Sequence, residues 1–238
     1  MSLTRPDPNQ MTFLEHLEEL RWRLLKTVLA ILSGTILAFI FHQPLVTWLL
    51  KPAAGIELIF TAPAEYFMVT LRVAFFAGLY LSLPVLLYQV IAFVAPGLTP
   101  AERRWTLPML VSAFLLFTAG ALFSYFFLLP VALKFLVGFA PEGINALLSI
   151  GNYLSFAASL VFASGLSFEL PLILFFLSLM GLVTSAQLKE FRRYFIIVAL
   201  VIAAVVTPSP DVFTQGILAI ALMALYELGI LLVKGIKR

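Results

Sequence analysis

The stretch Tyr88-Gln-Val-Ile-Ala-Phe-Val-Ala-Pro-Gly-Leu-Thr-Pro-Ala-Glu-Arg-Arg104 separates two long apolar runs of the sequence. The Pro96-Gly97 pair predicts a turn within it, because these two residues are the strongest local breakers of regular structure. One carboxylate, Glu102, stands beside Arg103-Arg104. A polar turn with a short charged cluster between two apolar runs predicts a loop that joins two membrane-spanning helices.

The composition supports a membrane protein and excludes several other classes. Of the 238 residues, 62% are hydrophobic and 11% are charged, whereas about a quarter of the residues of a soluble domain are charged. The length predicts one membrane domain over residues 1–238. The absence of cysteine excludes a disulfide framework and a zinc site of the cysteine type. We expect no cofactor, no metal and no nucleic-acid partner.

The apolar runs predict an all-α integral membrane protein with six transmembrane helices, at about 24–42, 67–88, 106–129, 153–181, 195–207 and 212–233. Lysine and arginine are divided very unevenly between the two sides of these spans. Twelve lie on one side, Lys51 and Lys134 lie on the other, and Arg72 is near that second end. Because cytoplasmic loops carry the excess of basic residues, both the N- and C-termini are predicted to be cytoplasmic.

Residues 1–23 are predicted to form a cytoplasmic segment, whose helix begins at a capping box of Thr12 and Glu15, lies on the membrane surface and runs into the first span. The longer segments 42–65 and 130–152 fall on the opposite side. Both are apolar enough to predict a structured outer cap. Pro130 is expected to kink the chain as it leaves the third span.

The last two helices are predicted to be short. Residues 195–206 give about 12 apolar residues and 212–226 give about 15, or about 18 and 22 Å of helix. A hydrocarbon core is about 30 Å thick. Two explanations remain open: the pair thins the bilayer locally, or flanking residues such as Arg192, Arg193 and Lys234 snorkel to make up the length.

Glu169, in the sequence Ser167-Phe-Glu-Leu-Pro171, lies near the middle of the fourth run. A charge at this depth costs about 2.5–3.5 kcal/mol on insertion scales. The residue is therefore either a packed, protonated carboxyl group or a site for a partner helix or a moving substrate. In the second case, a proton-coupled secondary transporter that uses Glu169 is an alternative function. The sequence shows no repeat relating its two halves, and this absence argues against a transporter.

The sequence does not predict an enzyme. His16 is followed by Leu17, so there is no His-Glu-x-x-His metal motif, and the second histidine lies on the other side of the predicted membrane. No serine and histidine share a predicted depth, and no glycine-rich phosphate loop is present.

Five motifs, in order along nearly the whole chain, together resemble the TatC family, the signal-peptide receptor of the twin-arginine translocase. They are His16-Leu-Glu-Glu-Leu-Arg-Trp-Arg-Leu24, Pro84-Val-Leu-Leu-Tyr-Gln89, Phe93-Val-Ala-Pro-Gly-Leu98 with Glu102-Arg-Arg104, Ser167-Phe-Glu-Leu-Pro171, and Thr207-Pro-Ser-Pro-Asp-Val-Phe-Thr-Gln215. The sequence departs from the family at Ala62-Pro-Ala-Glu65, a variant of an outer motif, and in a short C-terminal tail.

The resemblance implies a multimeric complex in the prokaryotic cytoplasmic (inner) membrane, in contact with membrane lipids. It implies as partners the twin-arginine signal peptides of folded cargo and single-span subunits of the TatA and TatB type, with export driven by the proton-motive force. The implied signal-peptide-binding residues are Glu19, Glu102, Arg21, Phe93, Pro96 and Arg103. The implied residues for insertion, partner contact or assembly are Glu169, Asp211, Gln215 and Pro52.

Each of three acidic residues also has a purely structural interpretation. Glu19 is four residues before Arg23 and is spaced for a helical ion pair, which contributes only about 0.2–0.5 kcal/mol. Glu102 is placed to favour the first turn of the next helix through the helix dipole. Asp211 is placed to cap the last helix. For Glu19 and Glu102, carboxylates also offer the acceptors that a pair of guanidinium groups requires.

Overall fold

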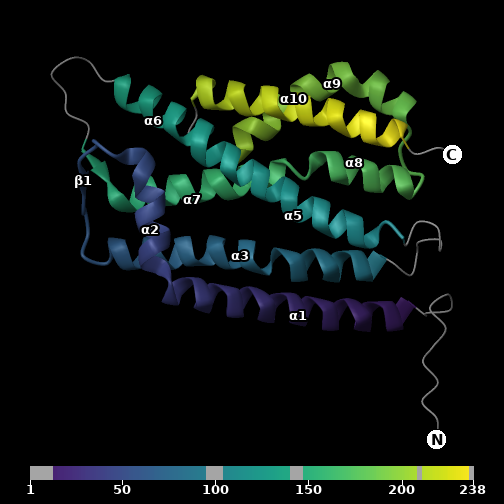
Figure 1. Cartoon of the computed structure of the whole chain (residues 1–238), viewed down its shortest axis with the longest axis horizontal. Helices are drawn as coiled ribbons and strands as arrows, with labels where there is room; N and C mark the ends of the chain where they lie inside the picture. The colour runs from purple at the N-terminus through teal and green to yellow at the C-terminus, as the bar shows by residue number, and fades with distance from the viewer. Residues whose placement is uncertain (1–12, 95–103, 140–146, 208–210, 236–238) are drawn as a thin grey trace, which may run out of the picture.

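The computed structural model describes residues 13–94, 104–139, 147–207 and 211–235. Within these ranges the chain forms helices that run along one long axis, with short elements at one end (Figure 1). The elements are α1 (Phe13–Ile40), α2 (His42–Leu50), the 3-10 turn η2 (Lys51–Ala53), β1 (Leu58–Ile59), α3 (Glu65–Val94), α5 (Thr106–Phe123), the π-helical turn η4 (Ser124–Leu128), α6 (Leu129–Gly138), β2 (Leu148–Ser149), α7 (Ile150–Ser167), α8 (Leu170–Leu179), α9 (Ser185–Val206) and α10 (Val212–Lys234).

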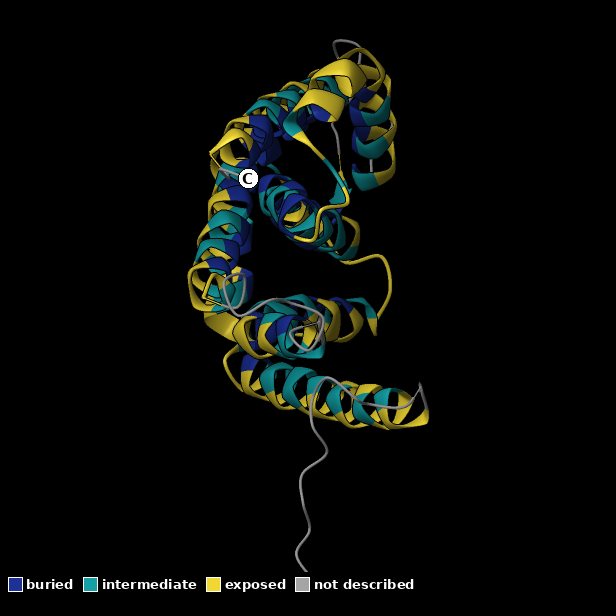
Figure 2. Ribbon diagram, turned by 90° about the vertical axis from the view of Figure 1, so that its right-hand side faces the viewer, coloured by how far each residue is buried: buried dark blue, intermediate teal, exposed yellow. Residues whose placement is uncertain are grey.

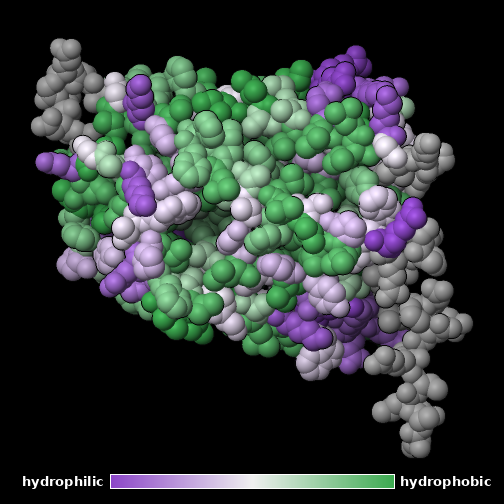
Figure 3. All heavy atoms as spheres, viewed as in Figure 1, coloured by the Kyte–Doolittle hydropathy of each residue, from purple (hydrophilic) through white to green (hydrophobic). Residues whose placement is uncertain are grey.

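The two ends of the bundle differ. At the end that we call the terminal end, α1 begins and α10 ends; at the cap end lie α2, β1 and the end of α6 (Figure 1). Between the two ends the surface is mostly apolar, while hydrophilic residues gather toward the ends (Figure 3). Among the described residues, five helical segments are long and apolar enough to cross a membrane. The chain is therefore a multi-pass membrane protein.

Helix α1 packs along α3 through small residues. A Cβ added at Gly34 would lie 2.7 Å from the carbonyl oxygen of Gly78, and one added at Gly78 would lie 2.5 Å from the backbone nitrogen of Thr35. The Ser82 hydroxyl lies 2.7 Å from the carbonyl oxygens of both Ala30 and Gly78. Close approach through glycine and serine is typical of helix pairs in membranes. Most of α1 is otherwise exposed, and it lies at one edge of a curved row of helices (Figure 2).

The predicted N-terminal helix runs into the first span, as expected. Helix α1 continues without interruption from Phe13 to Ile40, so residues 13–23 are its first turns. The predicted capping residue Thr12 lies outside the described residues.

The third span extends beyond its predicted end at residue 129. Helix α5 continues through η4 into α6, which ends at Gly138. Pro130 is near the start of α6 and directly follows the π-helical turn η4, an irregularity of the kind that accommodates a proline within a helical path. The helical path therefore continues past the proline to Gly138.

The fourth span has its discontinuity at the predicted acidic residue. Helix α7 ends at Ser167 and α8 begins at Leu170, with Pro171 in its first turn. Helices α5 and α7 pack closely because Gly120 and Gly165 lack a Cβ: one added at Gly165 would lie 2.7 Å from the Phe117 ring. This contact holds the kinked fourth span against the third.

Helix α9 begins ten residues before its predicted span of 195–207, while α10 matches its predicted span of 212–233 to within one residue. The two helices have 22 and 23 residues, so both are longer than the apolar stretches of about 12 and 15 residues that predicted short helices. At about 1.5 Å per residue, each is about 33–35 Å long. The prediction counted only apolar residues, whereas α9 begins at Ser185 with a capping box between Thr184 and Gln187. The polar first half of α9 also explains why α9 is not among the five segments apolar enough to span a membrane.

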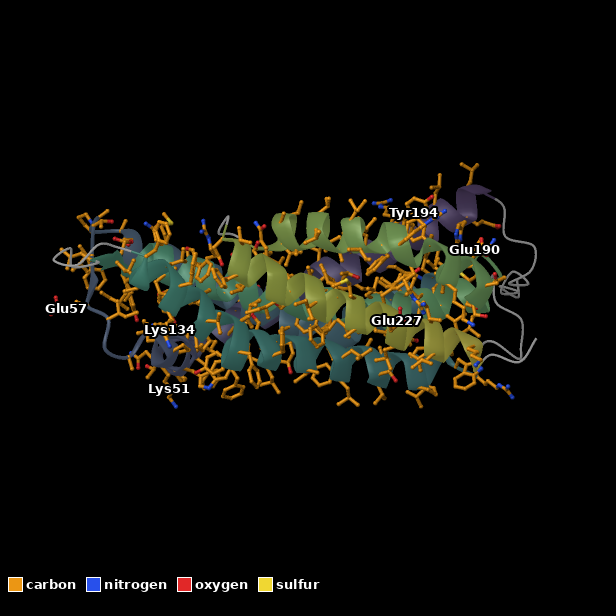
Figure 4. The ribbon with its side chains drawn as sticks, turned by 90° about the horizontal axis from the view of Figure 1, so that it is seen from above. Lys51, Glu57, Lys134, Glu190, Tyr194 and Glu227 are labelled. Carbon is orange, nitrogen blue, oxygen red and sulfur yellow. The ribbon has the colours of Figure 1, made fainter. Side chains whose placement is uncertain are left out.

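Two contacts tie α9 to α10. The Tyr226 ring stacks on Phe195, with ring centres 3.9 Å apart, and its hydroxyl donates to the carbonyl oxygen of Leu188 at 2.7 Å. At the same level of the bundle, Arg192 pairs with Glu227, with Nη2 2.8 Å from Oε2. Figure 4 shows Glu227 on the same part of the bundle as Glu190 and Tyr194, far from Lys51, Glu57 and Lys134.

At the cap end, β1 and β2 pair in parallel, with Leu58 opposite Leu148 and Ile59 opposite Ser149. The Glu65 carboxylate joins this pair to the start of α3. Oε2 accepts from the backbone nitrogen and hydroxyl of Thr61 at 2.5 and 2.7 Å, and Oε1 accepts from the Ser149 hydroxyl and from the Gly151 nitrogen. One carboxylate thereby links two loops that are more than 80 residues apart in the sequence.

Two tyrosines donate hydrogen bonds to the last turn of α2. The Tyr125 hydroxyl donates to the carbonyl oxygen of Trp48 at 2.8 Å, and the Tyr153 hydroxyl donates to that of Leu49 at 2.6 Å. Carbonyl groups in the last turn of a helix lack the usual partner four residues later, and the Lys51 N–H also donates to the Trp48 carbonyl. The Trp48 and Tyr125 rings also stack, with centres 3.7 Å apart.

Candidate functional site

The start of α1 and the end of α3 bring five side chains together at the terminal end. His16, Glu19 and Arg23 come from α1, while Gln89 and Phe93 come from α3. Spacings of three and four residues place the first three on one face of a helix. We call this group the α1–α3 site.

Arg23 holds Glu19 from one side. Its Nε donates to Oε1 of Glu19 at 2.9 Å, and its Nη2 donates to the same oxygen. Its third nitrogen, Nη1, donates to Oε1 of Gln89 at 3.3 Å, so the guanidinium group joins the two helices. The side chains of Glu19 and Arg23 are 19% and 22% exposed, so the pair is largely shielded from solvent.

The second oxygen of Glu19 has no hydrogen-bond donor. Among the described residues, Oε2 is buried and accepts no hydrogen bond, and Nδ1 of His16 lies 3.6 Å from it. The His16 ring stacks on Phe93, with centres 4.3 Å apart and planes inclined by 14°. The site thus contains the Glu19 carboxylate beside the stacked rings of His16 and Phe93. One carboxylate oxygen accepts hydrogen bonds from Arg23, and the other accepts none from the described residues.

This arrangement can accept a cation from outside the chain. A buried carboxylate oxygen without a donor carries a desolvation cost that an incoming guanidinium or ammonium group relieves. The structural interpretation of Glu19 as an i,i+4 partner of Arg23 is confirmed. The hydrogen bonds from Arg23 involve Oε1 and leave Oε2 of Glu19 unused, so the ion pair and a binding role are compatible.

The predicted binding residues are only partly described. Arg21 is exposed on α1 and Phe93 lies within the α1–α3 site. Pro96, Glu102 and Arg103 lie outside the described residues. The expected meeting of Glu19 and Glu102 therefore stays a prediction.

Glu169 lies at the junction of α7 and α8, where it is the N-cap residue of α8. It is 7% exposed, and within the described part of the chain its Oε1 accepts no hydrogen bond. Both interpretations of Glu169, as a packed carboxyl group and as a site for a partner helix or a moving substrate, stay predictions.

The other predicted residues lie at the cap end, away from the α1–α3 site. Asp211 caps α10 as predicted, since its Oδ1 accepts from the Thr214 nitrogen at 2.6 Å. Gln215 follows one turn later and is half-buried. Pro52 lies in η2 and is also half-buried. The predicted residues that are described therefore occupy separate places along the bundle.

The sequence alone did not predict that Gln89 accepts a hydrogen bond from Arg23 or that His16 stacks on Phe93. The spacing of His16 and Glu19 contained a signal, because three residues separate neighbours on a helix face. Nothing in the spacing of Gln89 pointed to Arg23, since the two residues are 66 apart. Among the described residues, no cluster of potential metal ligands is present.

Comparison with known proteins places the chain in a family. The profile of the Sec-independent protein translocase protein (TatC) family matches residues 15–220. The chain is 41% identical to the Sec-independent protein translocase protein TatC of Synechocystis sp., over 94% of this chain and 89% of that protein. It is 41% identical to TatC of Aquifex aeolicus, over 94% of this chain and 95% of that protein, and 44% identical to the chloroplastic TATC of Arabidopsis thaliana, over 96% of this chain and 68% of that protein.

Solved structures agree with the sequence comparison. A crystal structure of the twin arginine translocase receptor TatC superposes with a TM-score of 0.79 at 41% identity, over 92% of this chain and 98% of that one. A second, in the detergent DDM, superposes with a TM-score of 0.83 at 40% identity, over 92% and 99%. The chain belongs to the TatC family of Sec-independent protein translocase proteins.

Proposed function

We propose that this chain is the receptor subunit of a twin-arginine translocase and that it binds signal peptides at the α1–α3 site. The observation that carries the proposal is the Glu19 carboxylate, with Oε1 held by Arg23 and Oε2 buried without a hydrogen bond from the described residues. Family membership gives the role, and this carboxylate gives the recognition chemistry.

Arginine of the signal peptide donates to Oε2 of Glu19. A hydrogen bond to a charged group contributes about 1.5–3 kcal/mol, and the planar guanidinium group offers several donors in a fixed geometry. Glu102, from the loop that follows α3, takes the second arginine. Lysine lacks this planar fork, so a twin-lysine peptide binds more weakly.

Arg23 and Gln89 prepare the carboxylate for this contact. Without Arg23, Glu19 would be free to change rotamer, and part of the binding free energy would be lost in ordering it. The hydrogen bond from Arg23 to Gln89 fixes the guanidinium group relative to α3. The Phe93 ring, stacked on His16, forms the apolar border on which the hydrophobic part of the signal peptide begins.

The roles of the other predicted residues follow from how the helices are placed in the membrane. All six long helical segments cross the prokaryotic inner membrane as one domain, α9 included, with the terminal end in the cytoplasm and the cap outside. Glu169 contacts the inserted peptide or the single-span partner subunits of the TatA and TatB type. Asp211, Gln215 and Pro52 support assembly at the outer end. Transport uses the proton-motive force and needs no catalytic residue.

Binding of a fluorescent twin-arginine peptide to the purified protein tests the proposal. Glu19→Gln keeps the shape of the side chain and removes its charge, so affinity falls about tenfold or more. Glu18→Gln is the matched control, because Glu18 lies next in the sequence but is exposed. Equal affinities of the two variants would overturn the proposed site.

A further inference from the structure

A groove separate from the α1–α3 site runs along α5 in the terminal half of the bundle. Helix α10 forms its opposite wall with Leu228 and Leu232, and Leu172 and Phe175 of α8 form its floor. Its volume is about 840 Å³. Along α5 it extends from Arg104 to Ala119, which corresponds to about 22 Å at 1.5 Å per residue.

The groove is polar at one end and apolar along its length. Arg104 lies at the terminal end, is exposed, and makes no salt bridge with any described residue. Its guanidinium carbon is 5.7 Å from the centre of the Trp105 ring, which packs edge-on against Phe175. On the opposite wall, Gly235 directly follows Lys234. Beyond this mouth the lining is apolar except for Ser112.

We propose that this groove binds an anionic phospholipid, with the phosphate of its headgroup at Arg104 and an acyl chain between α5 and α10. Three properties of the groove fit this ligand. The cation is at the end where a headgroup lies, a tryptophan is at the depth of the membrane interface, and the apolar part continues into the hydrocarbon layer. Basic pockets between helices on one side of a membrane protein bind anionic headgroups by the same chemistry.

The length of the groove fits a lipid. One leaflet is about 15 Å of hydrocarbon, half of the usual 30 Å, so a groove of about 22 Å accommodates a headgroup contact and a full acyl chain.

The sign of the charge also separates this groove from the proposed receptor site. A peptide that carries arginines is repelled by Arg104, whereas the α1–α3 site offers it a carboxylate. The lipid proposal therefore does not depend on the receptor proposal, and either can fail while the other holds.

Quenching of Trp105 fluorescence by brominated lipids tests the proposal in reconstituted vesicles. Trp22→Phe and Trp48→Phe leave Trp105 as the single tryptophan. Brominated phosphatidylglycerol is expected to quench it at a lower mole fraction than brominated phosphatidylcholine. A basic residue near an anionic lipid contributes about 1 kcal/mol, or about a fivefold preference, and Arg104→Gln should remove that preference.

Arg193→Gln is the matched control. Arg193 lies over its neighbour Tyr194 as Arg104 lies over Trp105, with its guanidinium carbon 4.8 Å from the ring centre, but α9 does not line the groove. The control should keep the full preference for phosphatidylglycerol. Equal quenching by the two lipids, or an equal loss in both variants, would overturn the proposal.

A second pair of variants tests the apolar part of the groove. Ser112→Phe fills it, while Val111→Phe adds the same bulk to an exposed neighbouring position outside its lining. Quenching by lipid brominated in the acyl chain should fall in the first and persist in the second. Displacement of brominated phosphatidylglycerol by millimolar inorganic phosphate would show a site for the free ion and would contradict a lipid site.

Discussion

Glu19 gains its proposed role from the asymmetry of its two oxygens. Arg23 donates twice to one oxygen, and the other is buried without a hydrogen bond from the described residues. The sequence predicted both Glu19 and its partner Arg23, because their spacing is that of a helical ion pair. It could not predict which oxygen stays available or that Gln89 fixes the arginine, since both depend on how α1 packs against α3.

Tyr226 provides a test of packing at the level of one residue. Tyr226→Phe keeps the stacking on Phe195 but removes the hydroxyl that donates to the carbonyl oxygen of Leu188. We expect a loss of about 1 kcal/mol in the free energy of unfolding, measured by chemical denaturation in detergent. Tyr194→Phe is the control, because Tyr194 is exposed. An equal loss in both variants would show that the buried hydrogen bond contributes nothing specific.

Glu65 is expected to determine the order of the cap. Glu65→Gln replaces an acceptor of several hydrogen bonds from Thr61, Ser149 and Gly151 with a side chain whose nitrogen accepts none. The melting temperature in detergent should fall and protease should cut the cap loops sooner. Glu57→Gln, an exposed change in the same cap (Figure 4), should leave both properties unchanged. Unchanged proteolysis of the Glu65 variant would contradict this assignment.

At the scale of elements, the sequence predicted the existence of the long helices better than their ends. Hydropathy located the five described segments that are long and apolar enough to span a membrane, because a helix in lipid must be apolar over many turns. The continuation of the third helix to Gly138 was missed because the π-helical turn η4 accommodates Pro130 within the helical path. The start of α9 was missed because a helix continues into water when a capping box and tertiary contacts support it. Hydropathy does not report either effect.

The α1–α3 pair should depend on its glycine contact. Gly78→Ala places a Cβ about 2.5 Å from the backbone of Thr35, so the helices must separate, at a typical cost of about 1–3 kcal/mol. Because the chain has no cysteine, spin labels at positions 29 and 85 can report the α1–α3 distance. The distribution should broaden, and affinity for a twin-arginine peptide should fall as Arg23 moves away from Gln89.

Gly216→Ala is the control for this substitution. A Cβ added at Gly216 meets nothing within 4 Å, so neither the distance distribution nor the affinity should change. A narrow, unshifted distribution in the Gly78 variant would show that the α1–α3 contact adapts without cost.

At the scale of the whole molecule, the uneven distribution of basic residues predicts which end faces the cytoplasm. Residues predicted for opposite sides of the membrane lie at opposite ends of the described structure. Lys51 and Lys134 lie at one end, and Glu190, near the basic residues of α9, lies at the other (Figure 4). The fold confirms the separation of the two groups, while the direction in the membrane stays a prediction.

Labelling of single cysteines in intact cells tests the six-span topology. A membrane-impermeant maleimide should react at positions 57 and 212 from outside, and at positions 190 and 234 only after the cells are opened. Position 212 decides whether α9 crosses the membrane, since it lies between α9 and α10. Labelling of position 234 in intact cells would indicate five crossings and would contradict the proposed topology.

The central claim is that Glu19 binds an arginine of a signal peptide directly, and a double-mutant cycle measures this contact most directly. The binding free energy is determined for the wild-type chain and Glu19→Gln, each with a peptide carrying the arginine pair and with one carrying glutamines in its place. The account predicts a coupling free energy of about 1.5–3 kcal/mol between the carboxylate and the arginines. A coupling near zero, with both changes weakening binding independently, would contradict it.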